Sequence, residues 1–303
     1  MDRVEEGGKA CLPALDLPGT VGAVFDDPAP SGDPALIEVH RIAVQLLDPH
    51  GTVLAAGWFR HGDTPGEALA QVLVAAGTDP PVAAALADAI PLRSVRSMPR
   101  PAVSHGVLLH LLILEYLAPP GLDLSAGRDA TLDETELTEV LAAWADGGRA
   151  DPLGGQAGRA VIKVQRPGVY VVVMDGERVL LTQLDRSGRW TLPGGGIDLG
   201  EQPEVSLARE AHEETGLTLH DVRLAGVSTA RWTGRAPDRV VEDFQAVQLL
   251  YTATAPTDVE PHVVEVGGST SAVAWVRTDD VVGRPLTYVA LSGLSLVGVT
   301  LPE

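Results

Sequence analysis

Three glutamates in one short segment are the residues of this sequence best placed to do chemistry. Glu210, Glu213 and Glu214 are spaced i, i+3 and i+4, which puts them on one face of a helix that turns about 100° per residue. Only Arg209 lies near enough in sequence to offset their repulsion. A hard divalent cation with oxygen ligands would relieve it, so the spacing indicates a site for Mg²⁺ or Mn²⁺. The alternative is an ordinary acidic surface helix.

The segment before the acids has the composition of a glycine-rich turn that leads into this helix. Pro203 suits a first helical turn, where its missing N–H would have no partner. Gly216 is placed to adopt the left-handed conformation that ends a helix. Val205, Ala208 and Ala211 fall opposite the acids, so we expect one side of the helix to pack and the other to carry the carboxylates.

The spacing also matches a known family. The pattern Gly-x5-Glu-x7-Arg-Glu-x2-Glu-Glu-x-Gly-Leu runs from Gly195 to Leu217. It resembles the signature of the Nudix hydrolases at every fixed position, and Ala211 is a mild departure because the family prefers a larger aliphatic residue there. The resemblance extends over residues 168–290. It implies an α/β sandwich with a mixed sheet, a divalent metal site and hydrolysis of a phosphoanhydride bond.

The resemblance implies metal-binding roles for individual residues. Glu210 and Glu214 would be the main ligands, and Glu213 would bind a metal ion directly or through water. The backbone carbonyl oxygen of Gly194 or Gly195 would complete one coordination shell. The general base would be Glu210 or an acid later in the chain.

Other charged residues would support or extend this site. By the same resemblance, Arg209 and Glu201 would pair and orient the loop against the helix. Family members often use a further acid outside the motif as a ligand or base, and Glu242, Asp243 and Glu265 are the candidates. The interpretation favoured for each of them is nevertheless an ordinary surface carboxylate.

A substrate pocket would need groups that stack on a base and contact a phosphate. Trp190, Arg231 and Trp232 are candidates for these roles, with core packing as the alternative for the two tryptophans. His212 falls on the expected packed face of the acidic helix, so we interpret it as a core residue or one that supports the site from behind, rather than as a catalytic residue.

Composition narrows the classes of partner. The chain has 303 residues and a net charge of −19, with Lys9 and Lys163 as its only lysines. The negative charge repels nucleic acid and anionic membranes, so we expect neither as a partner. Cys11 is the only cysteine, which excludes an intrachain disulfide. There is no signal-peptide pattern and no apolar run long enough to span a bilayer, so we expect a cytoplasmic protein.

Patterning along the chain predicts two domains of alternating strands and helices, an α/β or α+β class. Residues 1–35 are expected to be a mobile lead-in, 36–150 an N-terminal domain and 160–303 the catalytic domain. Besides the acidic helix, helices are expected at residues 64–76 and 131–144. Strands are expected at residues 39–47, 52–59, 107–117, 161–165, 169–174, 178–184, 222–230, 246–253 and 273–276.

The two halves resemble each other in three segments. Residues 45–54 resemble 172–180, residues 64–70 resemble 202–208, and residues 111–119 resemble 248–256. We therefore interpret the first half as a diverged, degenerate Nudix-like copy. Val72, Ala75 and Ala76 stand where acids would be needed, so this copy cannot hold the metal site. An unrelated small α/β domain is the alternative.

These observations lead to a functional hypothesis with two rivals. The first reading is a Mg²⁺-dependent pyrophosphohydrolase that cleaves a nucleoside diphosphate linked to another group. The alternatives are a non-enzymatic sensor of nucleotides or metabolites on the same fold, and diphosphate chemistry without hydrolysis. We expect the protein to form either a homodimer or an internal pseudo-dimer of its two halves. The sequence does not select one substrate.

Overall fold

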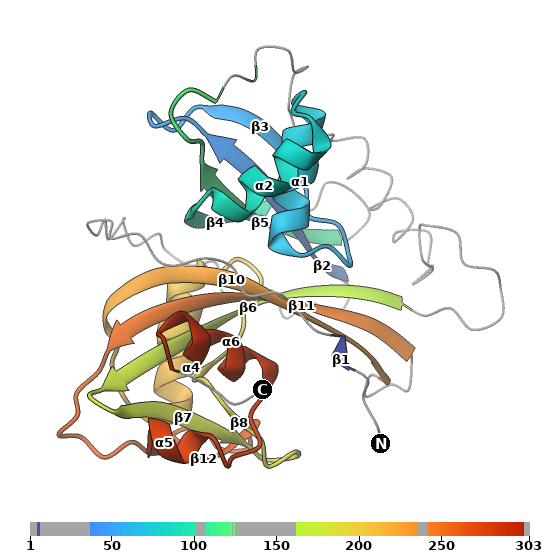
Figure 1. Ribbon diagram of the computed structural model, residues 1–303. Coiled ribbons are helices and arrows are strands. Elements are labelled where there is room, and N and C mark those ends of the chain that lie inside the picture. Colours follow the sequence, from blue (N-terminus) through green and yellow to red (C-terminus); the bar gives the residue numbers. More distant parts are fainter. Residues whose placement is uncertain are drawn as a thin grey trace.

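The computed structural model describes residues 5–6, 37–100, 107–122, 124, 162–235 and 241–299. In that part of the chain two mixed β-sheets form the framework, one in each half. Figure 1 shows the smaller sheet and its two helices lying over the long strands of the larger sheet. The fold is therefore of the mixed α/β class that the sequence predicts.

The first half is a four-stranded sheet with two helices. Its elements are β2 (Ile37–Leu47), β3 (Val53–Trp58), α1 (Pro65–Ala75), α2 (Pro80–Ala89), β4 (Leu92–Arg100) and β5 (Val107–Leu117). The β2–β3 turn forms because Asp48 accepts hydrogen bonds from the main-chain N–H groups of His50 and Thr52, both at 2.8 Å. Helix α1 begins with a capping box in which Thr64 and Glu67 bond to each other's main-chain N–H.

The second half contains the larger sheet. Its elements are β6 (Ile162–Asp175), β7 (Arg178–Leu184), β8 (Trp190–Thr191), β9 (Gly194–Gly196), α4 (Pro203–Thr215), β10 (His220–Arg235), β11 (Val241–Thr254), β12 (Thr270–Arg277), α5 (Thr278–Val281) and α6 (Tyr288–Leu296). A two-residue strand from the start of the chain, β1 (Glu5–Glu6), pairs with β10.

Four strands follow the same order in both sheets. The first sheet runs β3-β2-β5-β4, and the second contains β7-β6-β11-β10. In each, the inner pair is parallel and both outer strands are antiparallel to their neighbours. Gln45 pairs with Glu115 in the first sheet, and Val172 pairs with Thr252 in the second. These are the same positions that the resemblance between residues 45–54 and 172–180, and between 111–119 and 248–256, aligns.

Alternate residues of β6 and β11 face two different cores. Val171 and Leu249 belong to a cluster that includes Leu207 of α4 and continues into the first half. Val172 and Leu250 face the other side, where α6 covers them. Helices α4 and α6 therefore pack against opposite faces of the sheet, which is the sandwich arrangement expected from the family resemblance.

Several elements differ from the sequence-based expectations. Helices α2 and α6 were not predicted, because their small or uniformly apolar residues give weak periodicity. Strand β4 was not predicted either, because its sequence LRSVRSMPR contains three arginines and a proline and lacks a regular apolar alternation. Strand β6 continues through Pro167, where two separate strands were expected. The expected helix at residues 131–144 lies outside the described residues. In the lead-in, Glu5 and Glu6 form β1, and the remainder of residues 1–35 is likewise not described.

Among the described residues, no helix is both long and apolar enough to cross a membrane.

Candidate functional site

Helix α4 presents the acidic motif, and its two ends match the sequence prediction. Pro203 occupies the first turn, and Gly216 ends the helix in the left-handed conformation with φ of 69°. The packed face differs from the prediction, because Val205 is 53% exposed and Ala208 is also exposed. Ala211 is buried as expected. Leu207, which was not placed on the packed face, is buried in the core as well.

Arg209 connects the loop before α4 to two of the acids on the helix. Its guanidinium donates to Glu201 through Nε and Nη2, both at 2.9 Å. It also donates to Glu210 at 2.9 Å and to Glu213 at 3.2 Å. Burial opposes ionisation of Glu201, but hydrogen bonds from Arg209 and Ser206 hold the pKa of its carboxyl below the usual value. The expected Arg209–Glu201 pair is therefore present and orients the loop against the helix.

Glu214 is buried, with only 4% of its surface exposed. Its carboxylate accepts hydrogen bonds from the Gly194 main-chain N–H at 3.0 Å, from Thr182 at 3.4 Å and from Thr270. Burial raises the pKa of Glu214 to about 7, and the nearby charge of Glu210 adds to this, while the three donors oppose it. The acids thus do not form a purely solvated face, because one of them lies against strands β7, β9 and β12.

Glu210 lies directly against the glycine loop. A Cβ atom at Gly195 would overlap the Glu210 carboxylate, so any larger residue at this position would displace that side chain from the loop. Burial raises the pKa of Glu210, with hydrogen bonds from Arg209 opposing the shift. The loop is fixed by the pairing of Gly194 with Tyr170 and of Gly195 with Val169 on β6.

The donor set suits a hard divalent cation only after a local change. In the described part of the chain, no three His, Cys, Asp or Glu side chains meet closely enough to hold a metal ion. Glu210 and Glu213 each have one carboxylate oxygen bonded to Arg209, and Glu214 Oε1 accepts from Thr270. Yet Glu210 and Glu214 are carboxylates whose burial disfavours their charge, and a cation with oxygen ligands would offset that cost. The residues therefore fit such a group.

The end of α4 is tied to the loop before β12. The N–H groups of Val264 and Glu265 donate to the Glu213 carbonyl oxygen at 2.9 and 3.0 Å, and the N–H of His262 donates to that of Thr215 at 3.0 Å. Of the three further acids considered from the sequence, Glu265 is therefore brought beside the acidic helix. His212 is exposed, so its interpretation as a core residue is wrong.

The other two further acids lie elsewhere. Asp243 forms a two-contact ion pair with Arg231, at 2.8 and 2.5 Å, and this pairing lowers its pKa. The main chain of Glu242 pairs with Ile162. Both residues belong to the part of β11 that lies next to the first half, away from the loop of Gly194 and Gly195.

The three candidate substrate-binding residues are not brought together. Trp232 packs on Phe244 with ring centres 4.5 Å apart, and Arg231 is engaged by Asp243. Trp190 lies on β8, and the guanidinium of Arg284 stacks over its ring, 4.7 Å from the ring centre. Trp190 is thus the one member of the set on a strand that leads directly into the glycine loop.

Two glutamines that the sequence analysis did not identify join the halves. Gln202 exchanges two hydrogen bonds with the main chain of Ser97 on β4, at 2.9 and 3.2 Å. Gln245 accepts from the N–H of Gly62 at 2.9 Å and donates to the carbonyl oxygen of Asp63 at 2.7 Å. Gln202 occupies the N-cap of α4, where Ser, Thr, Asp or Asn is usual, and that mismatch was the available sequence signal.

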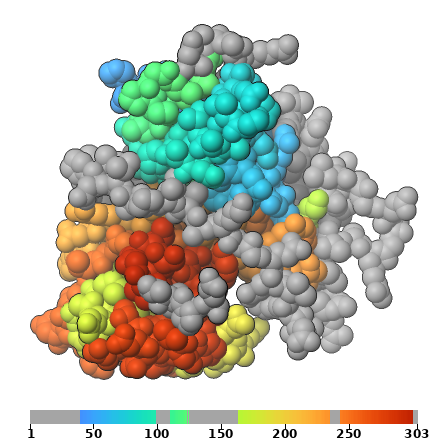
Figure 2. Space-filling model, in the orientation of Figure 1, coloured from blue at the N-terminus to red at the C-terminus, as the bar shows by residue number. Residues whose placement is uncertain are grey.

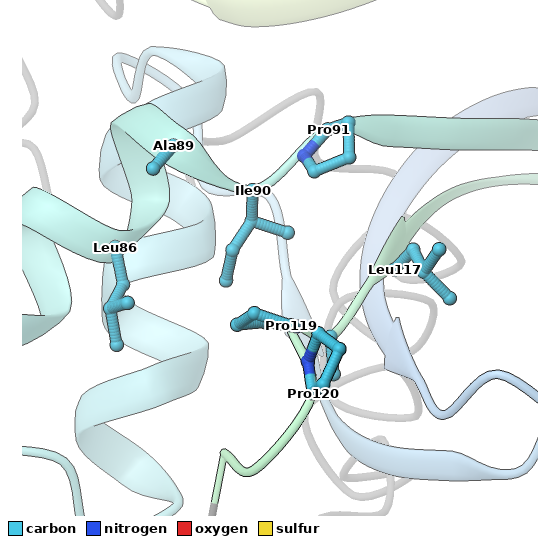
Figure 3. Close-up of a pocket in the computed structure, with 8 residues that line it drawn as sticks. Leu86, Ala89, Ile90, Pro91, Leu117, Pro119 and Pro120 are labelled. Atoms are coloured by element: carbon cyan, nitrogen blue, oxygen red, sulfur yellow. The ribbon is translucent and has the colours of Figure 1, made fainter. Parts of the chain in front are cut away.

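An apolar pocket of about 300 Å³ lies in the first half, between the end of α2 and the end of β5. Figure 3 shows that Leu86, Ile90 and Pro119 are among the side chains that line it. None of the described residues that line it is charged, so these residues cannot do the phosphate chemistry expected of the acidic motif.

Comparison with known proteins agrees with the motif. The NUDIX domain family model matches residues 164–292. A MutT-like protein from Streptomyces ambofaciens is 32% identical over 121 residues, which are 40% of this chain and 69% of that protein. An RNA pyrophosphohydrolase from Aliivibrio fischeri (strain MJ11) is 38% identical over 77 residues, 25% of this chain and 45% of that protein. The chain thus spans less than half the length of that second relative.

A solved MutT NUDIX hydrolase from Burkholderia pseudomallei is 30% identical, covering 44% of this chain and 98% of its own length, with a TM-score of 0.36.

Proposed function

Because this chain belongs to the Nudix family of hydrolases, which act on pyrophosphate bonds, we propose that it is a Mg²⁺- or Mn²⁺-dependent pyrophosphohydrolase. Its substrate would be a nucleoside diphosphate linked to a second group, and its products a nucleoside monophosphate and the phosphorylated second group. The observation that carries this proposal is the placement of Glu210 and Glu214 against the loop of Gly194 and Gly195.

The residues of this site would divide the work as follows. Glu210 and Glu214, with Glu213 and the Gly195 carbonyl oxygen, would hold the cation. When bound, a divalent cation neutralises non-bridging phosphate oxygens and makes a water nucleophilic. Arg209 would keep Glu210 and Glu213 oriented through the bonds that it makes to both. Glu210, whose pKa is raised by burial, suits acceptance of the water proton, and Glu265 is the second candidate.

The test is a metal-dependent hydrolysis assay with a matched pair of variants. Glu214→Gln should remove turnover while the protein still folds, since glutamine has nearly the same shape as glutamate. Glu260 is an exposed acid in the loop between β11 and β12. The Glu260→Gln variant should retain the parent rate. Wild-type rates in Glu214→Gln would contradict the assignment. Ligand binding without any nucleoside monophosphate formed would instead support a sensor, and an intact diphosphate in the product would support non-hydrolytic chemistry.

The substrate class is best assigned with a panel of nucleoside di- and triphosphates, nucleotide sugars and dinucleotides. We expect a small molecule, because a chain with net charge −19 repels longer polyanions. A 5′-triphosphorylated oligoribonucleotide belongs in the panel because one relative carries the name RNA pyrophosphohydrolase. Preferential cleavage of that oligonucleotide would contradict the small-molecule proposal.

For the first half we propose a role as an internal partner of the second, as a diverged copy that replaces a second subunit. The shared strand order and register support common descent of the two halves. In the alignment of the two strand orders, α1 is equivalent to α4, β4 to β10 and β2 to β6. The contacts between halves include α1 with β10, α4 with β4, β4 with β10 and β2 with β6.

This set of contacts maps onto itself when the equivalent elements are exchanged, which is the property of a two-fold symmetric interface. Figure 2 shows the two halves in direct contact. The proposal predicts that the full chain sediments as a monomer of 31.7 kDa. A stable species of twice that mass would show that a second copy is still required.

A further inference from the structure

Strand β4 is an edge strand of the first sheet, and its outer side faces the second half. Ser97 pairs with Leu112 of β5 on one side. On the other side its main-chain N–H donates to Gln202 Oε1 at 3.2 Å, and its carbonyl oxygen accepts from Gln202 Nε2 at 2.9 Å. One side-chain amide therefore pairs with the free edge as another strand would.

The side chain of Gln202 bonds to Ser97 and does not cap its own helix. It occupies the N-cap of α4 but makes no side-chain bond to its own helix, whereas Thr64 at the N-cap of α1 bonds to the N–H of Glu67. Its backbone is extended, with φ of −78° and ψ of 146°, as at Thr64. The two caps have the same backbone geometry, so the side chain of Gln202 is directed to the other half rather than excluded from capping by its backbone.

The residue next to Gln202 leads directly to the acids. Glu201 accepts two bonds from Arg209, both at 2.9 Å. Arg209 donates in turn to Glu210 at 2.9 Å and to Glu213 at 3.2 Å. A continuous series of hydrogen bonds and one peptide link thus runs from the edge of the first sheet to two of the proposed metal-binding carboxylates.

We propose that Gln202 is a positioning residue through which the first half holds the loop before α4, and with it the orientation of Arg209, Glu210 and Glu213. This inference rests on the proposed function, because the orientation matters only if these acids bind a cation. Gln202 itself is exposed on its outer side, so water can replace its bonds when they are lost. Its removal is therefore expected to change metal affinity rather than folding.

The test compares Gln202→Met with Gln245→Met. Both remove an amide that bonds to the main chain of the first half, but only Gln202 adjoins Glu201. Mn²⁺ binding is measured by electron paramagnetic resonance without substrate, together with the Mg²⁺ dependence of hydrolysis and thermal unfolding. We expect Gln202→Met to weaken Mn²⁺ binding about tenfold, as is usual when a residue supporting a metal ligand is lost.

The control variants should respond differently. Gln245→Met should lower the unfolding temperature and leave Mn²⁺ affinity within about twofold of the parent, a margin well below the tenfold loss above. Ser97→Ala should also retain affinity, because the bonds to Gln202 involve only main-chain atoms of Ser97. If Gln202→Met does not fold, Gln202→Asn, which keeps an amide but is too short to reach Ser97, takes its place.

Three outcomes overturn the inference. These are parent-like Mn²⁺ affinity in the Gln202 variant, an equal loss of affinity in Gln245→Met, or an equal loss in Ser97→Ala. Failure of the proposed function would look different, because the parent protein itself would then bind no Mn²⁺ and form no nucleoside monophosphate.

Discussion

Helices α1 and α4 occupy the same place in the two halves but carry different chemistry. Both begin with proline after an N-cap residue of extended backbone, Thr64 in one and Gln202 in the other. Counted from these caps, Glu210 and Glu214 correspond to Val72 and Ala76, which have only 3% and 2% of their surface exposed. The side chain of the α1 cap bonds within its own helix, and the apolar face of α1 is buried. The second directs its cap to the other half and its acids to the glycine loop.

The order of the strands alone does not determine whether a half presents acids to a glycine loop. The first half keeps four strands in the same order, but its connection from β3 to α1 is short and has no counterpart of β8 and β9. The short connection of the first half has no glycine loop that could place a main-chain N–H against α1 as that of Gly194 is placed against Glu214. The difference between the halves is therefore concentrated in one connection and one helix face.

The largest expected effect comes from placing an acid on α1. Val72→Glu buries a carboxylate with no cation nearby, and we expect it to lower the free energy of unfolding by more than about 3 kcal/mol. Val74→Glu, at a position that is 41% exposed, should change it by less than about 0.5 kcal/mol. Urea unfolding measures both. Similar values for the two variants would show that α1 tolerates acids and that the comparison between the helices is wrong.

The next effect concerns the glycine loop. In Gly195→Ala the added methyl group would overlap the Glu210 carboxylate and push it away from the loop. A displacement of about 1 Å should lower the hydrolysis rate about 100-fold. Gly196→Ala is the matched control, because a Cβ atom there meets nothing within 4 Å. Steady-state rates at saturating Mg²⁺ compare the two. Equal rates would mean that Glu210 does not need its present contact with the loop.

A smaller effect per residue involves the partly buried His40 and the buried His110, which lie where the halves meet. Burial, with the charges of His110 and Arg166, lowers the pKa of His40 to about 3, and burial lowers that of His110 to about 4 although Glu201 opposes this. The unfolded chain therefore binds these protons at higher pH than the folded one. Stability should be complete above pH 6.5 and fall as the pH approaches the folded-state values.

Between pH 6.5 and 5 we expect a loss on the order of 2 kcal/mol for each histidine. Urea unfolding at both pH values measures it. In the double variant His40→Asn/His110→Asn the pH dependence over this interval should become much weaker. An unchanged slope in the variant would assign the acid sensitivity to other groups.

The smallest effect separates the two N-caps. Thr64→Ala removes the capping box of α1 and should cost about 1 kcal/mol of stability. Mn²⁺ affinity should stay at the parent value, because α1 has no link to the acids. Thermal unfolding and Mn²⁺ titration of the same sample test both statements. A loss of Mn²⁺ affinity would show that loosening the first half in general disturbs the site.

The sequence was informative where a residue's neighbours along the chain determine its structure. Pro203, Gly216 and Thr64 give the helix boundaries that were predicted, because capping is a local interaction. The burial of Glu214 and the exposure of Val205 could not be predicted from helical periodicity, since they depend on where β7 and β12 lie. The pairing of Gln202 with Ser97 depends on contact between residues 105 positions apart, which no local pattern contains.

The apolar core that runs through both halves has a consequence for how the protein comes apart. Buried side chains of the first sheet, such as Leu112, belong to one cluster with Val247 and Tyr251 of the second. Neither half can lose its packing without exposing apolar surface on the other. Heating should therefore produce one cooperative calorimetric transition for the whole chain, rather than separate melting of the two halves.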